Sequence, residues 1–311
     1  MVQLFFHIFQ SLRPRQALKN LSLLAPLVFS GNLFVEEKFL LSFLGVITFT
    51  FLTSACYIIN DIIDLPRDQL HPIKKKRPIA SGILPLPIAF FIAVCFLFTS
   101  FWLGLWLNFF FFLILIIYFF LQLAYSFYFK NIIVLDVLII ATGFVLRVYA
   151  GAFLINVHMN VWFLLCVVSL ALFLAVGKRR AELAVLDLEK AGVHRKTLIF
   201  YTPQLLDVYL AMFANSAWLS YALFTFFSPP PPISQQFALY RFLPLALSGI
   251  NKWLMITIPL VIYGVMRYMS IIYQGNKAEA PEKILLSDRP LLTTVLIWGL
   301  MVVAILYGIK P

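Results

Sequence analysis

Charged residues are scarce in this chain, and cysteine is almost absent. Of 311 residues, 12% are charged and 62% are hydrophobic, and the mean hydropathy is +0.96. A soluble domain carries about 25% charged residues to cover its water-facing exterior, so this composition excludes a soluble enzyme and an intrinsically disordered chain. The three cysteines lie far apart inside apolar runs, a spacing that indicates packing residues rather than metal ligands or a redox pair.

Long apolar runs fill most of the sequence and predict transmembrane helices. A window of about 19 residues selects nine spans, which are 18–34, 40–59, 83–106, 109–128, 132–154, 161–177, 205–227, 252–272 and 291–309. We therefore predict an all-α polytopic membrane protein with nine transmembrane helices in a single membrane domain, residues 1–311. Residues 1–17 combine an apolar face with Arg13 and Arg15, a pattern that predicts an amphipathic helix at the membrane interface.

The net charge of +11 is concentrated in alternate loops, which argues against nucleic-acid binding. Eighteen of the 24 Lys and Arg residues lie in the segments 1–19, 60–82, 178–200 and 273–289 and at Lys130. Basic loops tend to stay on the cytoplasmic side of a membrane. We therefore predict a multi-pass protein of the inner (plasma) membrane. Its N-terminus and basic loops would face the cytoplasm, and its C-terminus would face outward.

An acidic cluster follows the second span, in the segment NDIIDLPRDQLHPIKKKRPIASG, residues 60–82. Asp61, Asp64 and Asp68 are spaced i, i+3 and i+7, so a helix would place all three on one face. Their mutual repulsion requires a compensating cation, and hard oxygen ligands suit Mg²⁺, with Mn²⁺ as a substitute. Pro66 lies among them and is expected to interrupt the helix.

Cations follow the acidic cluster directly. Lys74 and Arg77 can donate to phosphate oxygens, Arg77 in a bidentate manner, and Asn60 lies beside the carboxylates. Carboxylates followed by cations at a helix end are typical of a site for Mg²⁺ and a diphosphate. In the alternative interpretation, the acidic residues only solvate a cytoplasmic loop, and the basic residues are present because cytoplasmic loops are rich in Lys and Arg.

Two arginines, Arg147 and Arg267, lie within predicted spans. Arg147 is about 16 Å along a helix from Asp136, at about 1.5 Å per residue. An intramembrane arginine costs about 2.5 kcal/mol or more, so we expect Arg147 to face a polar cavity and to bind a substrate phosphate. Gly143 and Gly151, one turn away on either side, would allow close helix packing or ligand approach. Alternatively, Arg147 is structural and pairs with Asp136 or Glu182.

The sixth span ends in GKRRAELAVLDLEK, residues 177–190. Lys178 and Arg179 precede Glu182 by four and three residues, a spacing that allows salt bridges along a helix. These residues are interpreted either as a topological anchor or as a second phosphate-binding wall opposite the acidic cluster.

The segment NDIIDLPRDQLHP resembles the first signature, NDxxDxxxD, of the UbiA superfamily of intramembrane prenyltransferases. The resemblance is closest to the branch of decaprenyl-phosphate phosphoribosyltransferases. It is carried by RPRQALKN (13–20), the segment 60–82, DVLIIATGFVLRVYAG (136–151), GKRRAE (177–182), YTPQLL (201–206) and PEKILLSDRPL (281–291). Typical prenyltransferases of the superfamily have a second aspartate-rich motif after the sixth span, whereas cations lead that segment here, as in the phosphoribosyl branch.

The resemblance implies a nine-helix bundle around a cavity open to the cytoplasm. It also implies that a polyprenyl phosphate of the decaprenyl type attacks the anomeric carbon of 5-phosphoribosyl 1-diphosphate and releases pyrophosphate. Mg²⁺ would be held by Asp61, Asp64 and Asp68, which act with Arg147 in catalysis. The predicted substrate-binding residues are Lys19, Asn60, Lys74, Arg77, Tyr125, Lys130, Lys178, Arg179 and Glu182. In the branch, the product serves cell-envelope synthesis.

Two other functions fit parts of this pattern. A prenyltransferase that joins an isoprenyl diphosphate to an aromatic or other small acceptor would use the same Mg²⁺–diphosphate site. A transporter of anionic solutes would explain Arg147 but not the aspartate cluster beside a basic loop. Mg²⁺-dependent release of pyrophosphate from phosphoribosyl diphosphate would separate the three functions. The sequence is compatible with a homo-oligomer.

Overall fold

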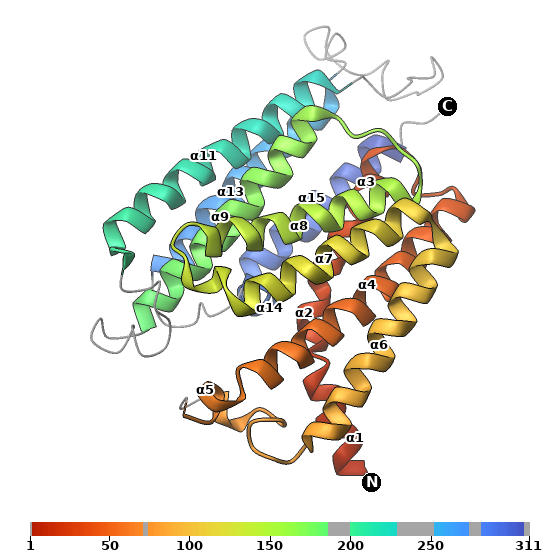
Figure 1. Cartoon of the computed structure of the whole chain (residues 1–311). Helices are drawn as coiled ribbons and strands as arrows, with labels where there is room; N and C mark the ends of the chain where they lie inside the picture. The colour runs from red at the N-terminus through yellow and green to blue at the C-terminus, as the bar shows by residue number, and fades with distance from the viewer. Residues whose placement is uncertain (1, 71–73, 186–199, 229–251, 274–280, 308–311) are drawn as a thin grey trace, which may run out of the picture. The chain divides into compact units, whose positions relative to one another are not determined.

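The computed structural model describes residues 2–70, 74–185, 200–228, 252–273 and 281–307, and its elements in this part of the chain are helices (Figure 1). Eight helices are long and apolar enough to cross a membrane, which confirms an all-α polytopic membrane protein. The described residues fall into two compact units. The first contains residues 2–27 and 32–157, and the second contains residues 28–31, 158–185 and those from 201 onward. The single membrane domain stays a prediction.

The first unit is built around four long helices that follow one another in the chain. They are α4 (Glu36–Ile63), α6 (Leu86–Leu107), α7 (Phe109–Phe127) and α8 (Leu135–Leu154). Helix α4 packs against α6, α7 and α8. Asn108 starts α7 because its side-chain oxygen accepts hydrogen bonds from the backbone N–H groups of Phe110 and Phe111. The shorter elements are α1 (Val2–Ser11), α2 (Pro14–Ala17), η1 (Leu18–Leu24), α5 (Leu65–Leu70), η2 (Lys74–Lys76) and η3 (Phe129–Asn131).

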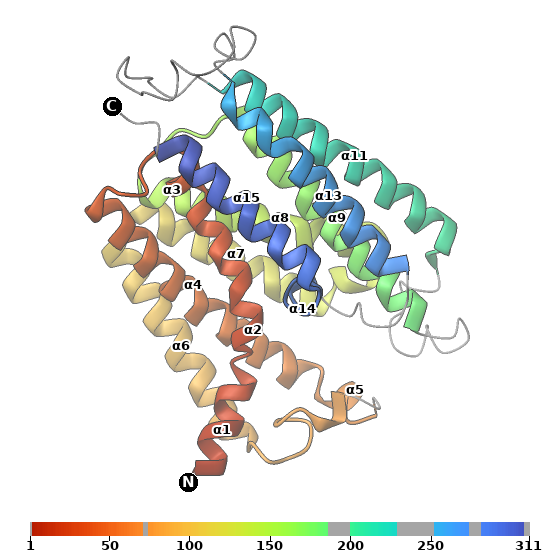
Figure 2. The same ribbon diagram turned by 180° about the vertical axis from the view of Figure 1, so that it is seen from behind.

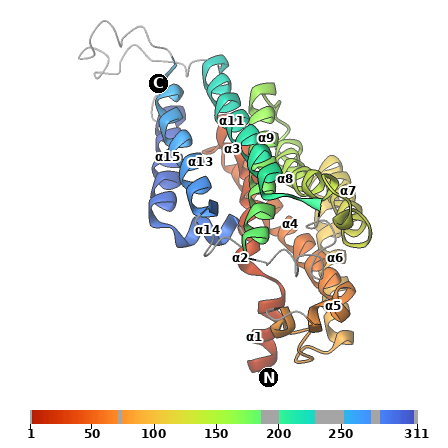
Figure 3. The same cartoon turned by 90° about the vertical axis from the view of Figure 1, so that its left-hand side faces the viewer.

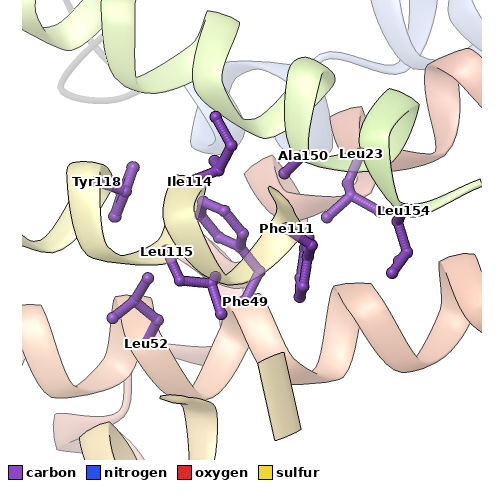
Figure 4. Close-up of a cluster of buried hydrophobic side chains, with 9 residues drawn as sticks. All are labelled: Leu23, Phe49, Leu52, Phe111, Ile114, Leu115, Tyr118, Ala150 and Leu154. Carbon is purple, nitrogen blue, oxygen red and sulfur yellow. The ribbon is translucent and has the colours of Figure 1, made fainter. Parts of the chain in front are cut away.

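The apolar core of the first unit lies where α4, α7, α8 and η1 meet (Figure 4). Leu23 of η1 packs there with Phe49 of α4 and Phe111 of α7, and all three are fully buried. Gly151 allows this approach: a Cβ atom at that position would lie 2.0 Å from the backbone oxygen of Leu23. The close packing predicted for Gly151 is therefore confirmed.

The second unit contains the other four candidate spans. They are α9 (Val161–Val185), α11 (Pro203–Phe227), η6 with α13 (Trp253–Thr257 and Ile258–Tyr273) and α15 (Arg289–Tyr307), and α14 (Pro281–Ser287) precedes α15. Helix α11 packs against α9 and α13, and α13 packs against α15 (Figures 2 and 3). Thr202 caps α11 by accepting from the N–H of Leu205, and Asp288 caps α15 by accepting from the N–H of Leu291.

The first predicted span, residues 18–34, is not among the eight helices. The chain instead forms the 3₁₀ helix η1 and then the short helix α3 (Ala25–Phe29). Pro26 has no backbone N–H to donate to the carbonyl four residues earlier, and Asn20 turns into the protein interior, where it is 1% exposed. A polar residue and a proline therefore replace a continuous spanning helix with two short ones, and nine spans are not confirmed.

The single helix predicted over residues 1–17 is two helices. They are divided at Arg13, whose φ of 54° and ψ of 59° are left-handed, a conformation that few non-glycine residues adopt. Helix α1 is two-sided: Ile8 and Leu12 pack toward a buried cluster of the first unit, and Phe6 and Phe9 are exposed. Its place at the membrane interface stays a prediction.

Candidate active site

The acidic cluster spans the end of α4 and the short helix α5. Asp61 lies in the last turn of α4, Asp64 ends that helix, and Asp68 lies in α5. The interruption expected near Pro66 is confirmed, because α4 ends at Ile63 and α5 begins at Leu65. Asp61 and Asp68 are buried, at 5% and 2% exposure.

Arg77 joins two of the three carboxylates. Its Nη1 lies 2.9 Å from Oδ1 of Asp61 and 2.5 Å from Oδ2 of Asp68. Two carboxylate oxygens from different helices therefore converge on one nitrogen. The short helix η2 lies directly before Arg77 in the chain. The side chain of Arg77 is 27% exposed, so solvent reaches this junction.

Arg13 is a site residue that the sequence analysis did not assign. Its Nη2 donates to Oδ1 of Asp61, and its guanidinium lies 5.0 Å from the centre of the Tyr57 ring. The only signal for it was the block RPRQALKN, which contributed to the family resemblance but gave no contact. A left-handed non-glycine backbone is uncommon and is found at functional sites more often than elsewhere, and here it directs Arg13 to the aspartates.

Asp64 belongs to a separate group of contacts. Its Oδ1 accepts from Nζ of Lys130 at 2.6 Å, and its Oδ2 accepts from Nδ2 of Asn60 at 3.3 Å. Ser126 in turn donates to Oδ1 of Asn60 at 2.8 Å. Asn60 and Lys130 are thus brought to the acidic cluster, as predicted, but around Asp64 alone.

The expected single face of three carboxylates is therefore not formed. Because α4 ends at Ile63 and Asp64 has φ −85° and ψ 1°, helical spacing does not continue from Asp61 to Asp68. Within the described residues, no three His, Cys, Asp or Glu side chains are grouped so that they could hold a metal ion. The structure supplies a pair, Asp61 and Asp68, in place of a triad.

This pair fits a magnesium ion that shares its coordination with a substrate. Mg²⁺ is usually bound through one or two carboxylates together with waters and substrate phosphates, and the oxygens of Asp61 and Asp68 already meet around one positive group. Burial raises the pKa of Asp68 above its usual range, an effect that outweighs the opposing attraction of Arg77 and Lys74. A further positive charge would offset this cost of burying the carboxylate.

A polar cleft opens beside Asp61. It has a volume of about 220 Å³ and is lined by Gln10, Ser11, Arg13, Asp61, Lys76, Arg77 and Pro78. Three of these side chains are cationic and one is anionic, a composition that suits a phosphate group held together with a divalent cation. Of the other predicted residues of this unit, Lys74 lies in η2 before Arg77, Lys19 lies in η1, and Tyr125 precedes Ser126 in α7.

Arg147 is buried in α8, and within the described residues its hydrogen bonds are not to the aspartates of the acidic cluster. Its Nε donates to Oδ1 of Asn20 at 2.9 Å, its Nη1 to the carbonyl oxygen of Gly143 at 2.7 Å, and its Nη2 to the Tyr118 hydroxyl at 2.6 Å. These partners are neutral, and in the described part of the chain neither Asp136 nor any other carboxylate forms an ion pair with it. The expected anionic partner is thus replaced by three neutral oxygens, which accept from three of the five N–H groups of the guanidinium.

Lys178, Arg179 and Glu182 lie in α9 of the second unit. Arg179 is fully buried and its Nη1 donates to Oε2 of Glu182, one turn further along the helix, as the spacing predicted. The role of these residues as a second phosphate-binding wall stays a prediction.

Comparison with known proteins identifies the family. The family model of the UbiA prenyltransferase family matches residues 21–287, so this chain belongs to that family of membrane proteins. The chain is similar to the decaprenyl-phosphate phosphoribosyltransferases of Corynebacterium glutamicum (32% identity, 96% of this chain and 86% of the relative) and Mycolicibacterium smegmatis (32%, 94% and 89%). The resemblance inferred from the sequence motifs is confirmed.

Solved structures agree with this assignment at the level of the fold. A UbiA homologue from Archaeoglobus fulgidus bound to DMAPP and Mg²⁺ superimposes with a TM-score of 0.67, covering 97% of this chain and 98% of the homologue at 20% identity. The same homologue has also been solved with Cd²⁺. Divalent cations are therefore bound by structural relatives of this chain.

Proposed function

We propose that this protein transfers the 5-phosphoribosyl group of 5-phosphoribosyl 1-diphosphate to a polyprenyl phosphate of the decaprenyl type, with release of pyrophosphate. The observation that carries the proposal is the convergence of Asp61 and Asp68 on one point within a cationic cleft. The names of the relatives that match over most of their length support this donor and acceptor.

The reaction needs charge balance more than proton transfer. The acceptor phosphate is already anionic near neutral pH, so its oxygen forms the new bond to the anomeric carbon without a general base. The bond from that carbon to the diphosphate oxygen breaks, and the electron pair leaves with pyrophosphate. A bound Mg²⁺ would neutralise the charge that develops on this leaving group. Catalysis then depends on positioning and on fixed positive groups.

The residues around the cleft divide these tasks. Asp61 and Asp68 would hold the Mg²⁺, and Arg77, already within reach of both, would turn to the diphosphate oxygens when the metal takes its place. Arg13 would stay at Asp61 as a second cation beside the leaving group. Asp64, which the sequence placed among the metal ligands, is proposed instead to hold Lys130 beside the site, because these two form an ion pair at 2.6 Å.

Further residues complete the proposed substrate site. Asn60 orients Asp64, and the additional cations or donors of the first unit are Lys19, Lys74 and Tyr125. In the second unit, Lys178 and Arg179, with Glu182 orienting Arg179, stay predicted donors to a substrate phosphate. The donor is a soluble metabolite, and the acceptor is a lipid. The proposed setting is therefore the plasma membrane, with the N-terminus and this site on the cytoplasmic side and the C-terminus outside.

A prenyltransferase reaction is the second candidate, because the A. fulgidus homologue has been solved with DMAPP and with GPP. Thermal protection of the purified protein separates the two donors, since a ligand that binds the folded state raises its stability. We expect phosphoribosyl diphosphate with Mg²⁺ to raise the melting temperature more than geranyl diphosphate with Mg²⁺, and EDTA to abolish the effect. The reverse order of protection would favour the prenyltransferase reaction.

A further inference from the structure

Arg147 is held inside the protein by hydrogen bonds to three different residues. Each of its three guanidinium nitrogens donates to a protein oxygen, and the group lies 5.0 Å from the ring centre of Tyr118 and 5.4 Å from that of Phe144. The residue is 5% exposed. Because the guanidinium is buried among these contacts, we look for its role in the groups that it holds.

Asn20 is the partner that links Arg147 to another part of the unit. Its Oδ1 accepts from Arg147, and its Nδ2 lies 3.1 Å from the hydroxyl oxygens of Thr50 and of Thr53 on α4. Asn20 is nearly fully buried. Both ends of its amide are therefore used, and residue 20 is tied to α8 on one side and to α4 on the other.

The segment that carries Asn20 also carries Arg13. Residues 14–24 are helical throughout, first as α2 and then as η1. A shift of one end of this helical segment is therefore expected to move the other end. At one end, Arg13 reaches Asp61. At the other end, the carbonyl of Leu23 lies against Gly151, one turn after Arg147 on α8. The segment 13–24 is thus held at three points, two of which are on α8.

We propose that Arg147 is a positioning residue: by holding Asn20, it fixes the segment 13–24 so that Arg13 is presented to Asp61 at the diphosphate site. This inference rests on the proposed function in so far as that function places the leaving diphosphate beside Asp61. It replaces the direct contact with substrate that was predicted for Arg147. The intramembrane charge then serves to anchor an N-terminal segment whose first residue takes part in binding.

Binding of magnesium pyrophosphate tests this role without requiring a particular donor. Pyrophosphate is the leaving group of both phosphoribosyl and prenyl donors, and its dissociation constant can be measured by calorimetry in detergent. We expect Arg147→Lys and Asn20→Ala each to weaken binding about tenfold, the size of effect found for residues that orient a metal ligand. Both variants should melt as a single folded species, which the same samples can show.

The decisive comparison uses Arg13→Ala as a background. If Arg147 acts through Arg13, adding Arg147→Lys to Arg13→Ala should weaken pyrophosphate binding no further. The inference is overturned if Arg147→Lys has the same effect in both backgrounds. It is also overturned if Asn20→Ala leaves the dissociation constant unchanged while Arg147→Lys raises it, because Arg147 would then contact the ligand itself.

Two glycines supply a matched pair of variants that change no charge. Gly151→Ala should weaken pyrophosphate binding, because the added methyl group meets the backbone of Leu23. Gly104→Ala should not, because there the close contact, at 2.4 Å, is with the side chain of Leu115 on α7, and the backbone of Phe112 is 3.7 Å away. If Gly151→Ala does not fold, Asn20→Ala serves in its place, and equal binding by all variants overturns the inference. Pyrophosphate binding without phosphoribosyl transfer would instead contradict the proposed function and leave this inference standing.

Discussion

Two arginines of the first unit show how the same side chain can be used in opposite ways. Arg77 lies at a partly exposed turn, and a single one of its nitrogens contacts the carboxylates of Asp61 and Asp68. Arg147 is buried in a spanning helix, and each of its nitrogens has a neutral acceptor of its own. The first arrangement combines charges of both signs with access to a cleft, whereas the second is buried and its hydrogen bonds are to neutral groups.

This difference decides which arginine can exchange partners. Around Arg77, a divalent cation can take over the two carboxylates and free the guanidinium for phosphate oxygens, so that each charged group keeps a partner of opposite charge. Around Arg147, an exchange would take the guanidinium from the buried amide oxygen of Asn20 and from the Tyr118 hydroxyl, and a buried group left without its partner costs about 1–3 kcal/mol. The first site is therefore suited to ligand binding and the second to holding the fold in place.

The largest effect is expected when the site around Arg77 loses a carboxylate. Asp61→Asn should lower Mg²⁺-dependent pyrophosphate release about 100-fold or more, because the metal loses an anionic ligand in the transition state. Glu37→Gln, an exposed position at the opposite end of the same helix, is the control and should retain activity. Undiminished turnover by Asp61→Asn, or activity that persists in EDTA, would contradict the metal site.

A change that keeps the charge of Arg77 should have a smaller effect. Arg77→Lys is expected to lower kcat/KM about tenfold, since an ammonium group cannot reproduce the planar fork that would make a bidentate contact with a phosphate. Lys75→Met removes an exposed charge two residues away and should leave kcat/KM close to the wild-type value. If Arg77→Lys and the wild type had equal steady-state constants, Arg77 would serve only as one of the basic residues that keep this loop on the cytoplasmic side.

Around Arg147, the expected loss is of protein stability. Tyr118→Phe removes the hydroxyl that accepts from Arg147 and should lower the free energy of unfolding by about 1–3 kcal/mol, measured by denaturant unfolding in detergent. Tyr149→Phe on α8 is the matched control, because within the described residues the Tyr149 hydroxyl has no hydrogen-bond partner. Equal stability of the two variants would mean that the hydroxyl of Tyr118 does not support Arg147.

The smallest effect concerns a third arginine, Arg267 of the second unit. Its hydrogen bond to Asp288 holds the pKa of that carboxyl below its usual value of 3.8. A carboxyl whose pKa is lowered by folding stabilises the protein above its unfolded pKa, and this stability is lost as the pH falls through the folded pKa. The melting temperature should therefore fall below about pH 4, and this acid-side loss should be reduced in Asp288→Asn. An unchanged acid profile in that variant would contradict the assignment.

The sequence predicted those features that depend on local patterns. Apolar runs identified the spanning helices, Pro66 marked the break after α4, and Gly151 marked a close approach. The acidic cluster was located correctly, but helical spacing was continued past Asp64, where the backbone leaves the helix. The short helices at residues 18–29 were predicted as a span, because hydropathy averages over the effects of Asn20 and Pro26.

The residues that the sequence did not assign are those whose role comes from distant contacts. Arg13 and Asp61 are 48 residues apart in the chain, and Asn20 and Arg147 are 127 apart. Composition and periodicity carry no information about such pairs. The partner of an intramembrane arginine was expected to be a carboxylate on energetic grounds, and only the fold could show that neutral acceptors surround it.

The central claim is that Asp61 and Asp68 hold a magnesium diphosphate whose departure transfers a phosphoribosyl group to a lipid. Its most direct test incubates the purified protein with 5-phosphoribosyl 1-diphosphate labelled in the ribose, Mg²⁺ and decaprenyl phosphate, followed by extraction of the lipids. The account predicts label in the lipid fraction and one pyrophosphate for each label transferred, with both lost in Asp61→Asn. Label that stays in the aqueous phase with the wild-type protein, while geranyl diphosphate is consumed in its place, would contradict it.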